Sequence, residues 1–121
     1  MNRADDGAAW HDFEHSLFVY TTVMSHTTDD YAVVDAGLKG IGIDGGMPLV
    51  FDWDDARYEG ASDEHGKLVF GVPSSHRRLG AKIRLVPFNC DPTVNLYDYF
   101  VCYRGDCVEA IWPITARGAV L

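Results

Sequence analysis

The stretch Arg84-Leu-Val-Pro-Phe-Asn-Cys-Asp-Pro-Thr-Val-Asn95 joins the end of a predicted strand to a polar turn. Apolar and polar residues alternate over 82–86, which is typical of a half-exposed strand. Pro87 ends this strand, because proline has no backbone N–H to donate to a sheet. Residues 89–91 then carry an amide, a thiol and a carboxylate, and these groups at a strand end indicate a metal-site loop that lacks one ligand.

Other short strands are predicted on both sides of this stretch. Each is rich in β-branched and aromatic residues or alternates in polarity, and turn-forming residues separate it from the next. No long segment has apolar residues at helical spacing, so the sequence predicts an all-β fold. We expect a small sandwich or barrel of mostly antiparallel strands with little helix. The further predicted strands are 17–24, 31–36, 49–53, 56–60, 67–72, 96–104 and 107–112.

The loop of the last predicted hairpin decides how Cys102 faces the second strand. A loop at Gly105-Asp106 places Cys102 opposite Glu109, whereas a loop at 104–105 places it opposite Cys107. The Gly-Asp loop is favoured, and no disulfide is then expected.

Length and composition bound the class of protein. The 121 residues, of which 47 % are hydrophobic and 12 % aromatic, suit one domain over 1–121. They leave no room for an additional barrel of about 250 residues. No apolar run approaches the roughly 20 residues that a membrane helix needs. The formal charge of −8 argues against a nucleic-acid partner, since such proteins cluster lysine and arginine.

The first residues and the cysteines bear on location. Residues 1–6 lack the apolar segment of a secretory signal, and three cysteines cannot all pair with one another. A cytoplasmic protein with reduced thiols is therefore expected.

Residues 37–46 form a segment rich in glycine. A phosphate-binding loop is one interpretation, but such loops need a strand before them and a helix after, and no helix pattern follows here. Structural turns are the favoured interpretation.

Four further blocks are distinctive: Asp12-Phe-Glu-His-Ser-Leu-Phe-Val-Tyr-Thr-Thr-Val-Met-Ser25, Ala32-Val-Val-Asp-Ala-Gly-Leu-Lys39, Ala61-Ser-Asp-Glu-His-Gly66 and Trp112-Pro-Ile-Thr-Ala-Arg-Gly118. Together with 84–95 they resemble the C-terminal β domain of the D-threonine aldolases and the related D-serine dehydratases. This family is of the alanine racemase type and uses pyridoxal phosphate. The resemblance implies a β domain detached from its N-terminal catalytic barrel.

The complete family cleaves or dehydrates D-β-hydroxy-amino acids, with a metal that orients the substrate hydroxyl. The resemblance therefore implies a domain of a lyase, inactive alone, that completes a metal- and pyridoxal-phosphate-dependent site with a barrel partner. The cofactor lysine of the family belongs to the missing barrel. The three lysines of this chain cannot take its place, because all lie in blocks that match the β domain; they are Lys39, Lys67 and Lys82.

The resemblance also implies a candidate set of metal ligands. The family's loop reads His-Cys-Asp-Pro-Thr-Val-Asn, so Asp91 falls at the carboxylate position and Asn89 at the histidine position. A neutral amide oxygen is a weaker ligand than imidazole for zinc or manganese, so weak binding is expected. Asp91 could instead make an Asx turn before Pro92. His65 could act as a ligand or proton carrier, although a surface turn is the favoured interpretation. Cys90 in a strand would face away from both neighbours and pack in the core.

The remaining histidines, His11, His15, His26 and His76, have no partner at metal spacing and receive no role. Six aromatic residues could instead form an exposed face that docks on a barrel or a second subunit. The alternative to a detached lyase domain is a free-standing β module that binds a small molecule or self-associates. The six aromatic residues are Trp10, Phe13, Phe18, Tyr97, Tyr99 and Trp112.

Overall fold

Alternating burial defines the first strand, β1 (Val19–Ser25), in the computed structural model, which describes residues 13–72 and 79–118. Val19, Thr21 and Val23 are buried, and the residues between them are partly or fully exposed. Because side chains alternate between the faces of a strand, β1 presents one row of side chains to a core and the other to solvent.

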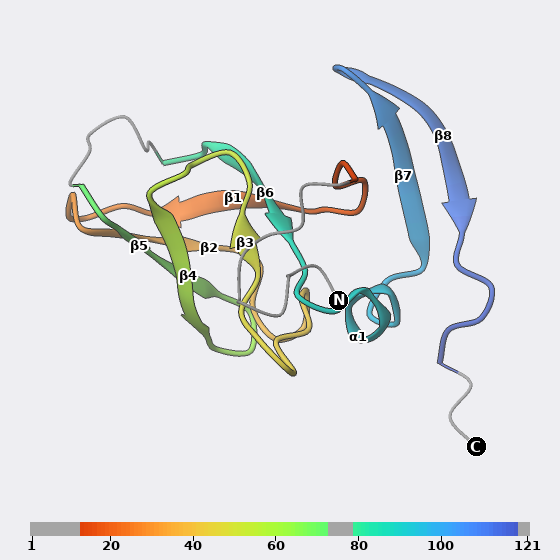
Figure 1. Cartoon of the computed structure of the whole chain (residues 1–121), viewed down its shortest axis with the longest axis horizontal. Coiled ribbons are helices and arrows are strands. Elements are labelled where there is room, and N and C mark those ends of the chain that lie inside the picture. Colours follow the sequence, from red (N-terminus) through yellow and green to blue (C-terminus); the bar gives the residue numbers. More distant parts are fainter. Residues whose placement is uncertain (1–12, 73–78, 119–121) are drawn as a thin grey trace.

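Six antiparallel strands close into a barrel in the order β1-β2-β5-β4-β3-β6 (Figure 1). β1 pairs with β2, which follows it in the sequence. β1 also pairs with β6, which is distant in the sequence, and Val19 lies opposite Leu85. The all-β fold with antiparallel strands and little helix is therefore confirmed. The other barrel strands are β2 (Tyr31–Val34), β3 (Leu49–Val50), β4 (Ala56–Ala61), β5 (Gly66–Phe70) and β6 (Lys82–Val86).

Aliphatic side chains fill the barrel, together with one tyrosine, Tyr58, which is 1 % exposed. Its hydroxyl donates to the carbonyl of Ala36 at 2.7 Å, so the buried polar atom is satisfied. The core consists of Val19, Val23, Ala32, Val34, Ala36, Ile41, Tyr58, Leu68, Ile83 and Leu85.

One short helix, α1 (Cys90–Val94), follows β6 in place of the extended loop predicted there. Cys90 is its first residue and is half-buried, so the expectation that Cys90 points to the opposite face of a strand is wrong. The amide nitrogens of Leu96 and Tyr97 donate to Thr93 and Val94 in the turn that leaves the helix. These bonds are why the next strand begins at residue 99 rather than at 96.

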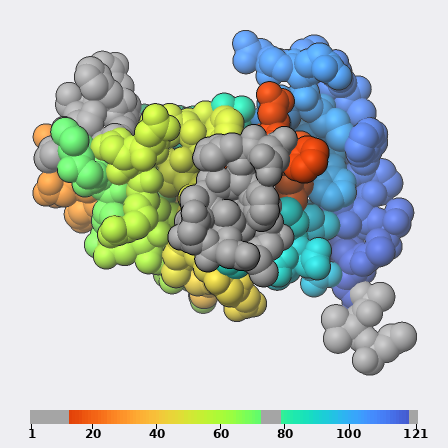
Figure 2. Space-filling view, viewed as in Figure 1, coloured from red at the N-terminus to blue at the C-terminus, as the bar shows by residue number. Residues whose placement is uncertain are grey.

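The last two strands, β7 (Tyr99–Arg104) and β8 (Cys107–Pro113), form a separate two-stranded sheet beside the barrel (Figures 1 and 2). Their turn is at Gly105-Asp106, as predicted, and Gly105 has a φ of 58°. A β-bulge shifts the register, so Cys102 lies opposite Ala110 rather than opposite Glu109. Cys102 and Cys107 are both free, so no disulfide links the strands.

No helix within 13–72 and 79–118 has the length and apolar character needed to cross a membrane.

Candidate functional site

Three loops that are distant in the sequence meet at one end of the barrel. Backbone hydrogen bonds of 2.9 Å join the amides of Leu38 and Lys39 to the carbonyls of Ser62 and Asp63. The amide of Gly42 donates to Oγ1 of Thr93 in α1 at 3.0 Å. The structure therefore brings together the glycine-rich segment 37–46 with Ala36 before it, the turn 62–66 and the 88–95 segment, all predicted from separate sequence blocks (Figure 1).

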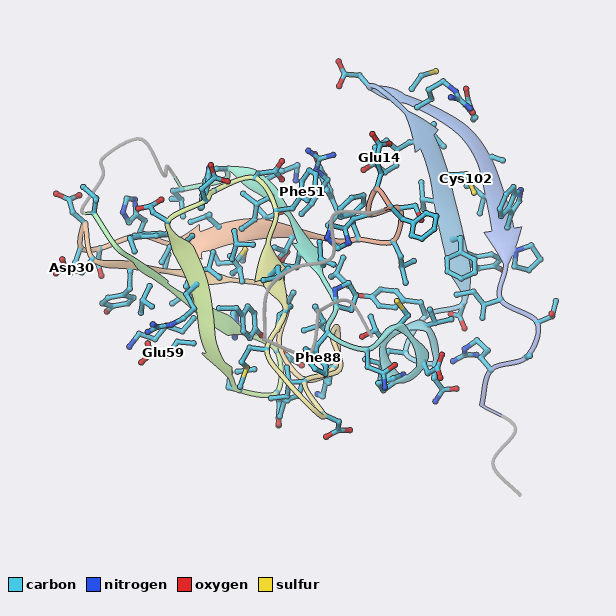
Figure 3. All side chains as sticks on the ribbon, viewed as in Figure 1. Glu14, Asp30, Phe51, Glu59, Phe88 and Cys102 are labelled. Atoms are coloured by element: carbon cyan, nitrogen blue, oxygen red, sulfur yellow. The ribbon has the colours of Figure 1, made fainter. Side chains whose placement is uncertain are left out.

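Glycine is required where these loops approach most closely. A Cβ on Gly37 would collide with the backbone of His65, and one on Gly46 would lie 2.6 Å from the ring of Phe88. Phe88 lies at this end of the barrel, near α1 (Figure 3). The glycine-rich segment is therefore a set of close-packed turns, as the sequence favoured. The helix α1 lies about fifty residues further along the chain and has fewer than two turns, so it is not the helix that a phosphate-binding loop needs.

Three side-chain hydroxyls hold this segment from three different parts of the chain. Tyr58 of β4 bonds the carbonyl of Ala36, Thr93 of α1 bonds the amide of Gly42, and Tyr97 bonds the carbonyl of Gly40 at 2.6 Å. Burial raises the pKa of Tyr58 to about 12, and burial and the charge of Asp35 raise the pKa of Tyr97. Both phenols therefore stay protonated, and remain donors, at neutral pH.

An open pocket of about 340 Å³ lies between the first two loops. Lys39 and Glu64 form an ion pair of 3.1 Å at its edge, and the hydrogen bond from Lys39 holds the pKa of Glu64 below its usual range. Asp35 accepts bonds from Thr21 Oγ1 at 2.6 Å and from the amide of Thr22 at 2.8 Å, which fixes its carboxylate. The pocket is lined by Asp35, Gly37, Lys39, Gly40, Glu64 and His65.

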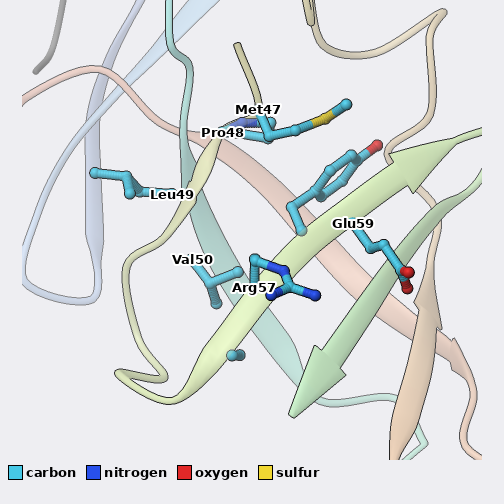
Figure 4. A pocket seen from close by; sticks show the side chains of 8 residues that line it. Met47, Pro48, Leu49, Val50, Arg57 and Glu59 are labelled. Atoms are coloured by element: carbon cyan, nitrogen blue, oxygen red, sulfur yellow. The ribbon is translucent and has the colours of Figure 1, made fainter. Parts of the chain in front are cut away.

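A second pocket, of about 240 Å³, opens between β3 and β4 (Figure 4). It arises because β3 has two residues and pairs with β4 only at Leu49 and Arg57, so the seam between them stays open. Its wall is mostly aliphatic, and Glu59 at its edge is paired with Lys67 at 3.2 Å. The first pocket, which has several polar side chains, is the better candidate for binding a polar ligand.

The three sequence-predicted metal ligands lie on two of the loops. Asn89 is the N-cap of α1, and its side-chain oxygen accepts the amide of Asp91 at 3.1 Å, so the Asx-type bond in this loop belongs to Asn89. Asp91 is exposed in the first turn, and His65 is exposed in the 62–66 turn. In the described part of the chain, no three His, Cys, Asp or Glu side chains are grouped to hold a metal. This donor arrangement does not fit a zinc or manganese site.

The lysines of this chain are all engaged in other contacts. Lys39 pairs with Glu64, Lys67 pairs with Glu59 and lies over the ring of Tyr31, and Lys82 donates to Thr22 Oγ1 at 3.2 Å.

Sequence reasoning overlooked Tyr58, Thr93 and Asp35 at this site. Asp35 lies in the block 32–39 and Thr93 in the stretch 84–95, but their contacts are with residues 14 and 51 positions away. The remaining histidines stay without a role: His15 packs edge-on against Phe51 and His26 against Phe70, while His11 and His76 lie outside the described residues.

Several known proteins are similar to this chain in sequence and fold. The family described as "Putative serine dehydratase domain" matches residues 16–103. The 3-hydroxy-D-aspartate aldolase of Paracoccus denitrificans is 45 % identical over 116 residues, which cover 96 % of this chain and 28 % of that protein. The crystal structure of D-threonine aldolase from Filomicrobium marinum matches with a TM-score of 0.84 and 49 % identity, over 92 % of this chain and 31 % of that one. This chain thus spans less than a third of either relative.

A more distant relative is itself short. The uncharacterized protein Rv1414 of Mycobacterium tuberculosis is 29 % identical over 91 residues, which cover 71 % of this chain and 68 % of that protein.

Proposed function

This chain belongs to the serine dehydratase domain family, and from that premise we propose that it serves as the C-terminal β domain of an aldolase- or dehydratase-like lyase. It supplies the three loops that form one wall of a site for D-β-hydroxy-amino acids. A barrel domain or subunit supplies the cofactor, pyridoxal phosphate, and the reaction, so the chain is inactive alone. The cytoplasm is the proposed location, in keeping with its free cysteines.

The similarity to the Paracoccus aldolase carries this proposal, since it extends over 96 % of the chain. The gathered loops support it, because they give the chain a polar pocket at one end of the barrel. Within that pocket, Asp35 is held in place by two hydrogen bonds and His65 lies on the neighbouring turn. Their part is to orient polar groups of the substrate, while the metal step of the family is not assigned to this chain.

Complementation in two pieces tests the proposal. The part of the Paracoccus aldolase outside the matched region is co-expressed with this chain, and the release of glycine from 3-hydroxy-D-aspartate is measured. We expect activity only when both pieces are present, and a loss of activity with His65→Ala. A Met24→Ala chain, changed at an exposed residue of β1, is the control and retains activity. Glycine release by this chain alone, or none from the pair, would contradict the proposal.

A free-standing β module is the second candidate, and the short relative Rv1414 favours it. On this alternative the family fold persists in a short protein as a scaffold for binding a small molecule or a second copy.

An Asn89→His variant separates the two candidates. If the chain serves a lyase whose ligand geometry is retained, imidazole at 89 and the carboxylate at Asp91 should together bind zinc or manganese stoichiometrically. Isothermal titration with each metal chloride measures this, and Asn89→His/Asp91→Ala is the control that should lose binding. A structurally intact Asn89→His chain that binds neither metal favours the free-standing module.

A further inference from the structure

The β7–β8 hairpin has an apolar face that the barrel does not cover. Residues directly opposite in an antiparallel pair share a face, so Tyr99, Val101 and Tyr103 of β7 lie on the same side as Val108 and Ile111 of β8. These five side chains, the hairpin face, are between 45 % and 62 % exposed. For aromatic and branched residues in a row, that exposure marks a surface suited to contact with another polypeptide.

Charged pairs lie at both ends of this face. Arg104 pairs with Glu109 at 3.1 Å beside the hairpin turn, and Arg117 pairs with Asp98 at 2.8 Å beside the base. An apolar centre with a polar rim is the usual anatomy of a protein interface.

Two aromatic rings and one carboxylate surround Arg84 on the barrel. Arg84 of β6 forms three side-chain hydrogen bonds with Asp52, the shortest of 2.6 Å. Its guanidinium lies 5.3 Å from the ring centre of Phe18 and 4.5 Å from that of Phe51. Phe51 lies on the side of the barrel nearest the hairpin (Figure 3).

A two-stranded sheet without further cover is only marginally stable in water. β7 and β8 pair only with each other, and neither pairs with a barrel strand. A contact beyond the strand pairing seen in the described residues would therefore stabilise the hairpin.

The base of the hairpin is also joined to the candidate site. Tyr97 lies two residues before β7 and donates to the carbonyl of Gly40 in the pocket wall. A polypeptide that packs on the hairpin would therefore stand next to the pocket.

We propose that the hairpin face is the docking surface for the barrel partner. This partner corresponds to the part of the relatives that the chain does not cover, and the inference rests on the proposed function. The chain spans 28 % of the Paracoccus aldolase and 31 % of the Filomicrobium aldolase, so more than two thirds of each relative is available to cover this face. No charged residue interrupts the face, so the contact is apolar and weakly dependent on salt.

The test uses a variant that changes the face and preserves the hairpin. Val101 and Ile111 are directly opposite each other, so Val101→Glu/Ile111→Lys makes the face polar while adding a cross-strand ion pair. Met24→Glu/Leu79→Lys is the matched control, because it places the same two charges at exposed apolar residues away from the hairpin, one in β1 and one in the turn before β6. Circular dichroism and thermal melting establish that all three chains fold.

Each tagged chain is co-expressed with the part of the Paracoccus aldolase outside the matched region. We expect similar amounts of that part to co-purify with the wild-type and control chains, and an amount at least about tenfold smaller with the hairpin variant. Full retention by the folded hairpin variant, or none by the wild type, overturns the proposal. The proposal is also overturned if light scattering shows that the wild-type chain alone forms a dimer and the hairpin variant does not, since a second copy then occupies the face.

Glycine release in the same eluates separates this inference from the proposed function. Retention that depends on the hairpin, without activity, leaves the docking surface intact and refutes the proposed function. Equal activity with the wild-type and hairpin-variant chains refutes the docking surface and leaves the proposed function intact.

Discussion

At the scale of single residues, three side-chain hydroxyls hold the glycine-rich segment at the candidate site. Tyr58, Thr93 and Tyr97 each satisfy one backbone group of the glycine-rich segment. Their contacts hold the segment in one conformation, which a binding wall requires.

The buried tyrosine gives a direct test of this arrangement. Tyr58→Phe keeps the ring in the core but removes the donor to the Ala36 carbonyl, which we expect to cost about 1–3 kcal/mol of stability. Urea unfolding measures the loss. Tyr20→Phe, at a tyrosine that is 66 % exposed, should change stability by less than about 0.5 kcal/mol. Equal effects of the two substitutions would contradict the assigned bond.

A carboxylate controls how the ion pair between Asp52 and Arg84 responds to pH. Burial acts to raise the pKa of Asp52, but the hydrogen bonds and charge of Arg84 outweigh burial and lower it. A group whose pKa is lower in the folded state stabilises above its unfolded pKa, about 3.9 for aspartate, and loses this contribution as pH falls through the folded value.

Wild type should therefore exceed Asp52→Asn in stability by about 1 kcal/mol at pH 7. The gap should close as the pH is lowered below about 4. Urea unfolding of both chains at a series of pH values measures it. A gap that is constant over this range would show that the charge of Asp52 makes no contribution.

At the scale of elements, close approach decides where glycine is needed. Gly37→Ala would push a methyl group into the backbone of His65, so we expect a loss of about 1–3 kcal/mol as the 62–66 turn shifts. Gly60→Ala in β4 is the matched control, since no atom lies within 4 Å of its Cβ position. Chemical unfolding compares them, and a stable Gly37→Ala chain would mean that the two loops are not packed as described.

The sequence predicted most elements because their patterns are local. The alternation in 82–86 corresponds to β6 (Lys82–Val86) without change, and the Gly105-Asp106 turn is where the hairpin signal placed it. The Cys102 register differed by one residue, because the bulge at Glu109 inserts a residue that the turn signal does not indicate.

The candidate site was harder to predict than the strands. Asn89 was weighed as a ligand, whereas its side chain caps α1, a helix too short to have a periodic signal. The contacts of Tyr58 and Tyr97 span 22 and 57 positions, so no local spacing reveals them. Of the expected aromatic face, four residues are exposed, namely Phe13, Tyr97, Tyr99 and Trp112, but Tyr99 and Trp112 lie on opposite faces of the hairpin. Phe18 packs against Phe51, and Trp10 lies outside the described residues.

At the scale of the whole molecule, the closed barrel and the hairpin should differ in stability. Every barrel strand has two neighbours, while β7 and β8 have one each. Hydrogen exchange should therefore be faster for the amides of β7 and β8 than for those of β1 and β6, because the hairpin can open without unfolding the core. Mass spectrometry of peptic peptides measures this, and equal protection would show that the hairpin and barrel unfold together.

The pairing of β1 with β6 has a consequence for how the protein is made. Val19 pairs with Leu85 in the neighbouring strand, so β1, once synthesised, has to wait for more than sixty further residues before its second neighbour exists. Until then, the row of β-branched residues on β1 lacks a complete partner surface. Chaperone demand during synthesis should therefore peak before β6 emerges and fall once the ring of strands can close.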